Sequence, residues 1–405
     1  MITTQAVVLC GGRGTRLRPL TDSLPKPLAP AGGAPFLLHL LRQLERNGYR
    51  EILLLTGYLG HLIASEFGDG SHLGLRITYQ HGPEEWETAL RLENAKALLR
   101  DHFLLLYGDN YSNFQTGKLE EVFRRFERIG CLTVFPRKTR ANLSLDASGE
   151  VRVYDSSRSA PGLNGVEIGY GLFSKEVFSC FTGQNESFSQ VLSRLGKSDQ
   201  LCAYRQAHPY YSVSDLARLR LADAFLTPQK TLLIDRDGTI NRKMPRGEYV
   251  QDWKQFEFIP ENLEAMTQLA AAGWRFVVIS NQAGVGRGVL TEAQVWELDR
   301  RMVDKLASRH VHVLKSYYCF HRWNEECLCR KPQPGLLLQA SEEHLLNLET
   351  TWYIGDDLRD CTAAWRAGCP AVLLGAEDPL ELPAEERPVL HYQSLQGFAC
   401  FLLSQ

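Results

Sequence analysis

The strongest constraint on the fold is a repeated alternation of short apolar runs and longer amphipathic segments. Runs such as 51–57 and 102–110 are rich in Leu and Val, and turn-forming residues such as Gly, Asp or Asn end them. Between such runs, residues 35–49 and 88–101 carry apolar side chains at three- and four-residue steps, as on amphipathic helices. This alternation predicts an α/β fold in which helices cover both faces of a mostly parallel sheet.

The pattern restarts in the middle of the chain. Thr227 and Pro228 follow a helix-like segment, and a fresh apolar run opens at Thr231. A chain of 405 residues is too long for a single ordinary core. We therefore predict two doubly wound domains, a Rossmann-type domain over residues 1–227 and a second α/β domain over residues 230–405.

Composition narrows the class of protein. A hydrophobic fraction of 44% indicates folded domains, and a formal charge of -2 gives no electrostatic reason to expect nucleic acid. Apolar runs stay well short of the roughly 18 to 20 residues of a membrane span, so no membrane partner is expected. Ten sparse, irregularly spaced cysteines favour a reducing compartment, so we expect a cytoplasmic protein. The oligomeric state stays open.

Four separated fragments of the second domain follow apolar runs. They are Asp235 to Thr239, Ser280 with Asn281, Arg330 with Lys331, and Gly355 to Asp360. In a parallel sheet the carboxyl ends of strands form the ligand crevice, so the four fragments should converge there. Asp-x-Asp-Gly-Thr alone would also suit a simple turn. Four fragments in this order are much harder to obtain by accident.

These fragments suit phosphoryl transfer. Asp235 as nucleophile would form an aspartyl phosphate, and Asp237 would protonate the departing oxygen and then deprotonate water. A Mg²⁺ ion held by Asp235, the backbone carbonyl of Asp237 and Asp356 would offset the repulsion between carboxylates and phosphate. Three further groups would hold the remaining phosphoryl oxygens: Ser280, the Asn281 backbone N–H and Lys331.

A cluster of soft ligands precedes Lys331. Cys319-x-His321 and Cys327-x-Cys329 form two pairs separated by a short loop. Three thiolates and one imidazole suit a closed, tetrahedral, structural Zn²⁺ site. Buried thiols beside a hydrogen-bonded histidine are the alternative interpretation of this spacing.

A glycine-rich segment follows the first strand. Leu17 stands where a dinucleotide-binding loop would have its third Gly, and no Gly-Lys-Ser/Thr follows as in a P-loop. A loop whose N–H groups approach phosphates, with cations nearby, still fits. The nucleotide-binding candidates are Gly11, Gly12, Gly14, Arg16 and Lys26.

The second domain resembles a known family over residues 230 to 395. "DRDGT", "SN", "RKP" and "GDD" look like the four motifs of haloacid dehalogenase superfamily phosphatases. "DRDGTIN", "NQAGVGRG" and "CLCRKPQPG" resemble the D-glycero-D-manno-heptose 1,7-bisphosphate 7-phosphatases, in which the Cys/His pattern is a zinc loop. Histidinol phosphatases keep much the same motifs. The resemblance implies a substrate-binding set of Tyr249, Asn281, Gln282, Arg287 and Arg330.

One segment departs from that family. The stretch "RKMPRGE" between Asn241 and Tyr249 is longer than the family pattern, and it lies where the substrate would be covered. The sugar specificity is therefore left open.

The first domain resembles the sugar-1-phosphate nucleotidyltransferases, of the mannose or heptose 1-phosphate guanylyltransferase kind, over residues 1 to about 226. The pattern G-G-x-G-T-R-L with Pro-Lys-Pro carries the likeness, which implies that Asp109 in "YGDN" binds Mg²⁺. Two departures concern its site. The segment Trp86 to Leu92 differs from the usual pattern, and Ser212 stands where a second metal carboxylate is usual. Two interpretations stay open: Asp215 replaces that carboxylate, or the site is weak or inactive.

Together these features predict a bifunctional enzyme of nucleotide-activated heptose synthesis, with Mg²⁺ and structural Zn²⁺. Its partners would be sugar phosphates and a nucleoside triphosphate, GTP by resemblance. One alternative is a phosphatase whose first domain binds nucleotide or sugar without catalysis. Another is a phosphatase for histidinol phosphate or a different small phosphomonoester.

Overall fold

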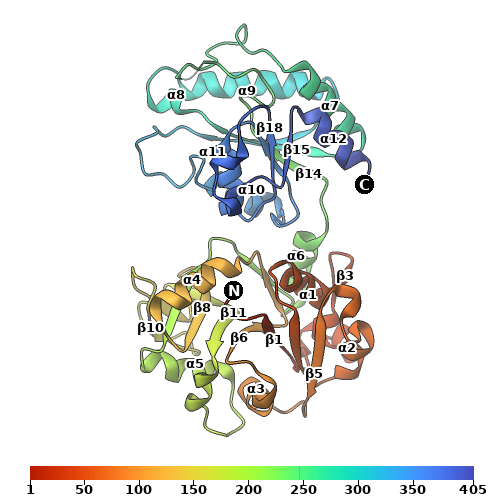
Figure 1. The fold of residues 1–405 in the computed structure, drawn as a ribbon, viewed down its shortest axis with the longest axis vertical. Coiled ribbons are helices and arrows are strands. Elements are labelled where there is room, and N and C mark those ends of the chain that lie inside the picture. Colours follow the sequence, from red (N-terminus) through yellow and green to blue (C-terminus); the bar gives the residue numbers. More distant parts are fainter. Residues whose placement is uncertain (246) are drawn as a thin grey trace. The chain divides into compact units, whose positions relative to one another are not determined.

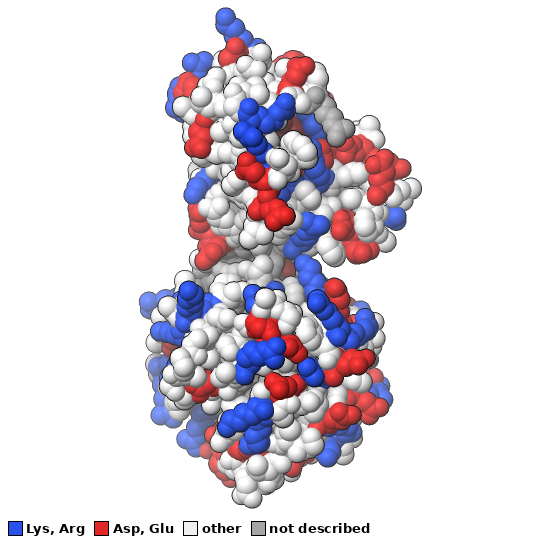
Figure 2. All heavy atoms as spheres, turned by 90° about the vertical axis from the view of Figure 1, so that its left-hand side faces the viewer, with Lys and Arg blue, Asp and Glu red and all other residues white. Residues whose placement is uncertain are grey.

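The computed structural model describes residues 1–245 and 247–405 (Figure 1). The chain divides into two compact units, Met1–Thr227 and Pro228–Gln405. Within the described residues, each helix is too short or too polar to cross a bilayer. On the face drawn in Figure 2, acidic and basic side chains are interspersed within each unit.

The amino-terminal unit contains a nine-stranded sheet. Its parallel part runs in the order β6-β1-β4-β5, and β11 lies antiparallel to β6. These five strands are β1 (Gln5–Cys10), β4 (Glu51–Thr56), β5 (Arg76–His81), β6 (His102–Tyr107) and β11 (Gly165–Ser174). The remaining strands of the sheet are β8 (Gly130–Pro136), β9 (Leu143–Leu145), β10 (Val151–Tyr154) and β12 (Leu201–Arg205).

Helices cover both faces of this sheet, as predicted. Along β1, Ala6 and Val8 belong to one apolar core, while Val7 and Leu9 belong to the other. The first core is completed by α1 (Phe36–Arg46), α2 (Gly60–Phe67), α4 (Thr116–Phe126) and α6 (Leu216–Leu226). The second is completed by α3 (Thr88–Asn94) and α5 (Phe188–Lys197). The doubly wound α/β fold is therefore confirmed for this unit.

The sheet is less parallel than the strand-and-helix alternation alone suggests. β9 and β10 pair antiparallel, and β11 is antiparallel to β6, β8 and β9. Only a short turn joins β9 to β10, and a connection of that length can only return the chain antiparallel. β7 (Asn110–Ser112) and β13 (Tyr210–Ser212) form a small antiparallel sheet directly after Asp109.

The carboxyl-terminal unit contains a six-stranded parallel sheet in the order β16-β15-β14-β17-β18-β19. These strands are β14 (Thr231–Ile234), β15 (Arg275–Asn281), β16 (Val313–Cys319), β17 (Tyr353–Gly355), β18 (Ala371–Leu374) and β19 (Leu390–Tyr392). One face packs on α7 (Pro260–Ala271), α9 (Glu292–Ala307) and α12 (Leu395–Leu403). The other packs on α10 (Gly335–His344) and α11 (Leu358–Arg366).

The strand order reverses direction at β14. The next strands along the chain, β15 and β16, lie on one side, and β17 to β19 lie on the other. Ligands of open α/β sheets bind at such a switch point, outside the carboxyl ends of the strands. The four fragments predicted to converge all follow, or lie beside, strands of this sheet.

Candidate active site and metal centre

Three carboxylates meet at the carboxyl ends of β14 and β17. Oxygen atoms of Asp235, Asp356 and Asp360 all lie within 4.8 Å of one another. Gly238 makes this approach possible, because its φ of 94° is left-handed and a Cβ there would come closer than 3.0 Å to the Asp356 carboxylate. Asp356 Oδ1 is buried without a hydrogen-bond partner among the described residues. This donor set fits a divalent cation that prefers oxygen ligands.

Lys331 is buried between two of these carboxylates and is only 3% exposed. Its Nζ lies 2.9 Å from Asp235 Oδ1 and 2.6 Å from Asp360 Oδ1, and it donates to Tyr353 Oη at 2.8 Å. Burial and the other two carboxylates raise the pKa of Asp235, although Lys331 opposes the shift. Burial lowers the pKa of Lys331, but Asp235 and Asp360 outweigh it and raise that pKa overall.

Asn281 holds the lysine segment in place. Its side-chain amide donates to Lys331 O and its side-chain oxygen accepts from Lys331 N, both at 3.0 Å. This pair fixes the end of β15 to the Lys331 segment. The sequence predicted a backbone N–H role for Asn281, and its side chain has this additional one.

The Asp237 carboxylate is held by three side chains. Arg236, 1% exposed, donates to both oxygens at 2.9 and 3.0 Å, and Asn241 and Gln282 donate at 3.0 and 2.6 Å. Burial favours the neutral acid, but these donors outweigh it and lower the pKa of Asp237. Gln282 also donates to Ser280 Oγ at 3.1 Å, so it links Asp237 to the serine.

A cavity of about 1040 Å³ opens beside these groups. Of the predicted set, the residues that line it are Asp237, Tyr249, Asn281, Gln282 and Arg330. Arg287 is exposed and does not line the cavity, although its guanidinium lies 5.7 Å from the Tyr249 ring centre. Among the described residues, seven further charged ones line the cavity: Lys243, Glu248, Asp357, Arg359, Glu377, Asp378 and Glu381.

The inserted segment "RKMPRGE" reaches the site. Lys243 Nζ lies 2.9 Å from Asp356 Oδ2 and 3.3 Å from Asp357 Oδ2. Arg246, in the same segment, lies outside the described residues. Sequence reasoning did not identify Lys243, because nothing in its neighbours along the chain indicates the contact.

Asp360 was also missed, although its stretch was singled out. Asp357 is the N-cap of α11, and Asp360 Oδ2 accepts from the Asp357 backbone N–H at 3.2 Å. Asp-x-x-Asp therefore looks like an ordinary capping box in the sequence. The signal that could have revealed it is its four-residue spacing from Asp356, which places both near one end of α11.

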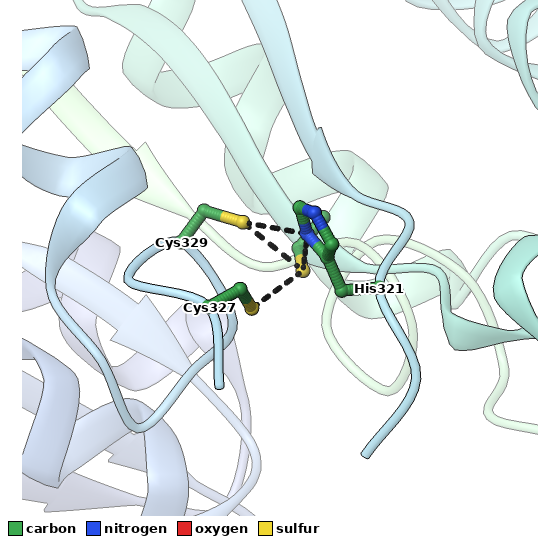
Figure 3. Close-up of side chains that lie close together, drawn as sticks. His321, Cys327 and Cys329 are labelled. Carbon is green, nitrogen blue, oxygen red and sulfur yellow. Dashed lines mark hydrogen bonds between the residues drawn. The ribbon is translucent and has the colours of Figure 1, made fainter. Parts of the chain in front are cut away.

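The Cys/His cluster forms as its spacing suggested (Figure 3). Cys319 Sγ lies 3.8 Å from Cys327 Sγ, 3.3 Å from Cys329 Sγ and 3.6 Å from His321 Nδ1. All four ligand atoms lie within 4.8 Å of one another. A tetrahedron with Zn–S bonds of about 2.3 Å has edges of roughly 3.8 Å, so the cluster fits this metal.

In the amino-terminal unit, the glycine segment lies at the carboxyl end of β1. Gly14 adopts a left-handed φ of 64°, and its carbonyl accepts from Thr21 Oγ1 at 2.9 Å. The Cβ side of Gly12 is open, whereas that of Gly11 is filled by the Arg91 guanidinium. Arg16 is exposed.

Asp109 follows β6 and forms an ion pair with Lys26. These two predicted residues therefore meet in space. Asp109 is also hydrogen-bonded through its backbone O to Val213 N, so the segment around Ser212 lies beside it.

The Ser212 hydroxyl contacts a positively charged side chain, which is an unfavourable environment for a metal ligand. Arg218 Nη1 donates to Ser212 Oγ at 3.4 Å and to Ser214 Oγ at 3.1 Å. Asp215 caps α6, because its Oδ1 accepts from Arg218 N at 2.9 Å. The carboxylate that the sequence offered as a substitute is thus already engaged by α6.

Each of the two units is similar to proteins of a known family. A family model described as nucleotidyl transferase matches residues 5–144, and one described as HAD-hydrolase-like matches residues 328–397. The fold of a putative glucose-1-phosphate thymidylyltransferase from Bacillus anthracis is similar, with a TM-score of 0.50 and 19% identity, covering 55% of this chain and 95% of that one.

Two curated relatives are D-glycero-beta-D-manno-heptose-1,7-bisphosphate 7-phosphatases. That of Photorhabdus laumondii is 37% identical over 172 residues, covering 40% of this chain and 90% of the relative. That of Pasteurella multocida is 39% identical over 141 residues, covering 33% of this chain and 75% of the relative. The chain therefore belongs to the D-glycero-beta-D-manno-heptose-1,7-bisphosphate 7-phosphatase family and also carries a nucleotidyltransferase-like unit.

Proposed function

We propose that the carboxyl-terminal unit removes the 7-phosphate of a heptose 1,7-bisphosphate through an aspartyl phosphate on Asp235. The observation that carries this proposal is the carboxylate cluster with Lys331 at the switch point of the sheet. Asp235 Oδ attacks phosphorus, and the P–O bond to the sugar breaks as Asp237 delivers a proton to the departing oxygen. Asp237 then takes a proton from the water that hydrolyses the acyl phosphate.

The surrounding groups hold the phosphoryl oxygens. Lys331 offers a buried cation beside Asp235, and Ser280 and the Asn281 backbone N–H offer hydrogen-bond donors at the end of β15. Asp237 must leave part of its contact with Arg236 to receive and deliver a proton, because those donors favour the carboxylate.

Asp235 and Asp356 would hold Mg²⁺, with the Asp237 carbonyl as a third ligand and Asp360 beside them. When bound, Mg²⁺ would neutralise the carboxylates facing the phosphate and polarise the phosphoryl oxygens. The cations Arg330, Lys243 and Arg359 of the 1040 Å³ cavity would face the rest of an anionic sugar phosphate.

The amino-terminal unit, residues 1–227, would couple the resulting heptose 1-phosphate to a nucleotide from GTP and release pyrophosphate. Gly12, Gly14, Arg16 and Lys26 would lie against the phosphates, and Asp109 would bind Mg²⁺. The product of residues 230–405 would then be the substrate of residues 1–227. A nucleoside triphosphate substrate and free thiols both suit the cytoplasm.

The test uses the full chain with D-glycero-D-manno-heptose 1,7-bisphosphate, Mg²⁺ and each of the four nucleoside triphosphates in turn. We expect phosphate release in every reaction and pyrophosphate release with GTP. Asp235→Asn should lower phosphate release by roughly three orders of magnitude or more, because no nucleophile remains.

Two other outcomes would contradict parts of the proposed function. Faster turnover of histidinol phosphate than of the heptose bisphosphate would contradict the sugar substrate. Phosphate release without pyrophosphate from any nucleotide would contradict the coupled scheme.

A second candidate, a non-catalytic nucleotide- or sugar-binding first unit, is favoured by one observation. The Ser212 hydroxyl contacts the Arg218 guanidinium, and a cation there opposes the binding of a second metal ion. GTP binding without turnover by the wild-type chain would support this candidate.

The carboxylate cluster predicts a pH dependence of Mg²⁺ binding. Burial raises the pKa of Asp235 to about 7 and that of Asp356 to about 6. Below these values the cation must displace protons, so Mg²⁺ affinity should rise with pH, by up to about tenfold per unit for one competing proton, and level off above pH 7. Isothermal titration calorimetry of the full chain measures this. The surface variant Asp304→Asn is the control, and a pH-independent affinity would refute the prediction.

We further propose that Cys319, His321, Cys327 and Cys329 bind structural Zn²⁺. Cys327→Ser removes one ligand and should reduce the zinc content. Phosphatase activity should fall by about tenfold or more, because Arg330 and Lys331 directly follow the cluster. Elemental analysis and activity are measured together, with exposed Cys400→Ser as the matched control. Full activity in zinc-free protein would defeat the proposal.

A further inference from the structure

The segment Trp86 to Leu92, which departs from the transferase pattern, ends in a buried arginine. Arg91 lies on α3 between Ala89 and Leu92, which pack into the second core of the amino-terminal unit. Its side chain is only 4% exposed. Burying a guanidinium is costly unless its N–H groups find acceptors.

Five backbone carbonyls satisfy this guanidinium. Nη1 donates to Thr56 O at 2.9 Å and Gly82 O at 3.4 Å. Nη2 donates to Gly11 O at 3.4 Å, Pro83 O at 2.6 Å and Glu84 O at 3.1 Å. A planar group with several fixed donors can span such a set, whereas the single ammonium of lysine cannot.

The acceptors come from three neighbouring strands. Gly11 follows β1, Thr56 ends β4, and Gly82 to Glu84 follow β5. β4 lies between β1 and β5, and all three run parallel, so their carboxyl ends lie side by side. Arg91 therefore joins three loops that have different positions in the chain.

Two glycines leave the space that the guanidinium occupies. A Cβ on Gly11 or Gly57 would come closer than 3.0 Å to Arg91. The same loops form a wall of a cavity of about 460 Å³, which Thr56, Gly57, Gly82, Pro83 and Glu84 help to line. Gly11 belongs to the glycine segment, so the clamp connects that segment to this cavity.

We propose that Arg91 is a positioning residue for the nucleotide site of the amino-terminal unit. Its guanidinium clamps the ends of β1, β4 and β5 and so fixes the spacing between the glycine segment and the adjoining cavity. The nucleotide part of this inference rests on the proposed nucleotidyl transfer. The clamp itself rests on the five hydrogen bonds.

The experiment compares Arg91→Ala, Arg91→Met and Arg91→Lys with the wild-type full chain and with Arg76→Ala. Arg76 is a matched control because its ion pair with Glu51 is at the surface of the same unit, with the arginine side chain 69% exposed. Hydrogen–deuterium exchange follows the segments 11–14, 56–60 and 82–86, and calorimetry gives the dissociation constant for GTP with Mg²⁺. All measurements are made below the melting temperature of each variant.

We expect faster exchange in all three segments and an at least tenfold weaker GTP complex in each Arg91 variant, with Arg76→Ala unchanged. Millimolar guanidinium ion should restore both properties in Arg91→Ala, because the truncated side chain leaves room for it. It should restore neither in Arg91→Met, whose side chain fills that room.

Two results would overturn the inference. One is wild-type exchange in the three segments of Arg91→Ala, and the other is GTP binding by that variant as tight as in the wild type or tighter. If the wild-type chain binds none of the four nucleoside triphosphates, the proposed nucleotidyl transfer fails. The exchange data still decide whether Arg91 is the clamp.

Discussion

The carboxyl-terminal unit depends on one buried lysine shared by two carboxylates. Lys331 lies within 2.9 Å of Asp235 and 2.6 Å of Asp360, and all three side chains are almost fully buried. Removing the lysine would leave two like charges in a medium where they repel strongly, and removing both acids would leave an unpaired cation. The remaining contacts at this edge of the sheet hold this group in place: Asn281 fixes the Lys331 backbone, Tyr353 accepts from its ammonium, and Gly238 lets Asp356 approach.

Much of this arrangement follows from the sequence, because strand ends in a parallel sheet share one edge. Asp235, Ser280 and Asp356 each follow or end an apolar run, so their convergence needed only the strand order. The Cys/His spacing similarly brought four ligand atoms together. Residues such as Lys243 were not predictable, because their partners lie more than a hundred positions away and no local pattern marks them. Asp360 was concealed for the opposite reason, since its local pattern has an ordinary structural explanation.

In the amino-terminal unit, too, some site residues could be predicted from the sequence and others could not. The glycine segment, Lys26 and Asp109 could be grouped from the sequence, and the structure brings Lys26 and Asp109 into contact. The departures from the family pattern could be located but not interpreted. Arg91 and Arg218 explain them in terms of contacts: the Arg91 guanidinium meets carbonyls from other loops, and the Arg218 guanidinium meets the Ser212 hydroxyl six positions earlier. Gly11 also has a structural role, because the absence of a side chain there leaves room for the Arg91 guanidinium.

The short distance along the chain within the Cys/His cluster has a thermodynamic consequence. Cys319 and Cys327 are eight positions apart, so a metal that joins them closes a very small loop. Closing a small loop removes little entropy from the unfolded chain, so the contribution of this entropy to global stability is modest. The benefit of a bound metal would be local precision: it would narrow the range of positions open to the two basic residues that follow. Through chain entropy alone, a cross-link of this kind acts more on the accuracy of a site than on the melting of the domain that carries it.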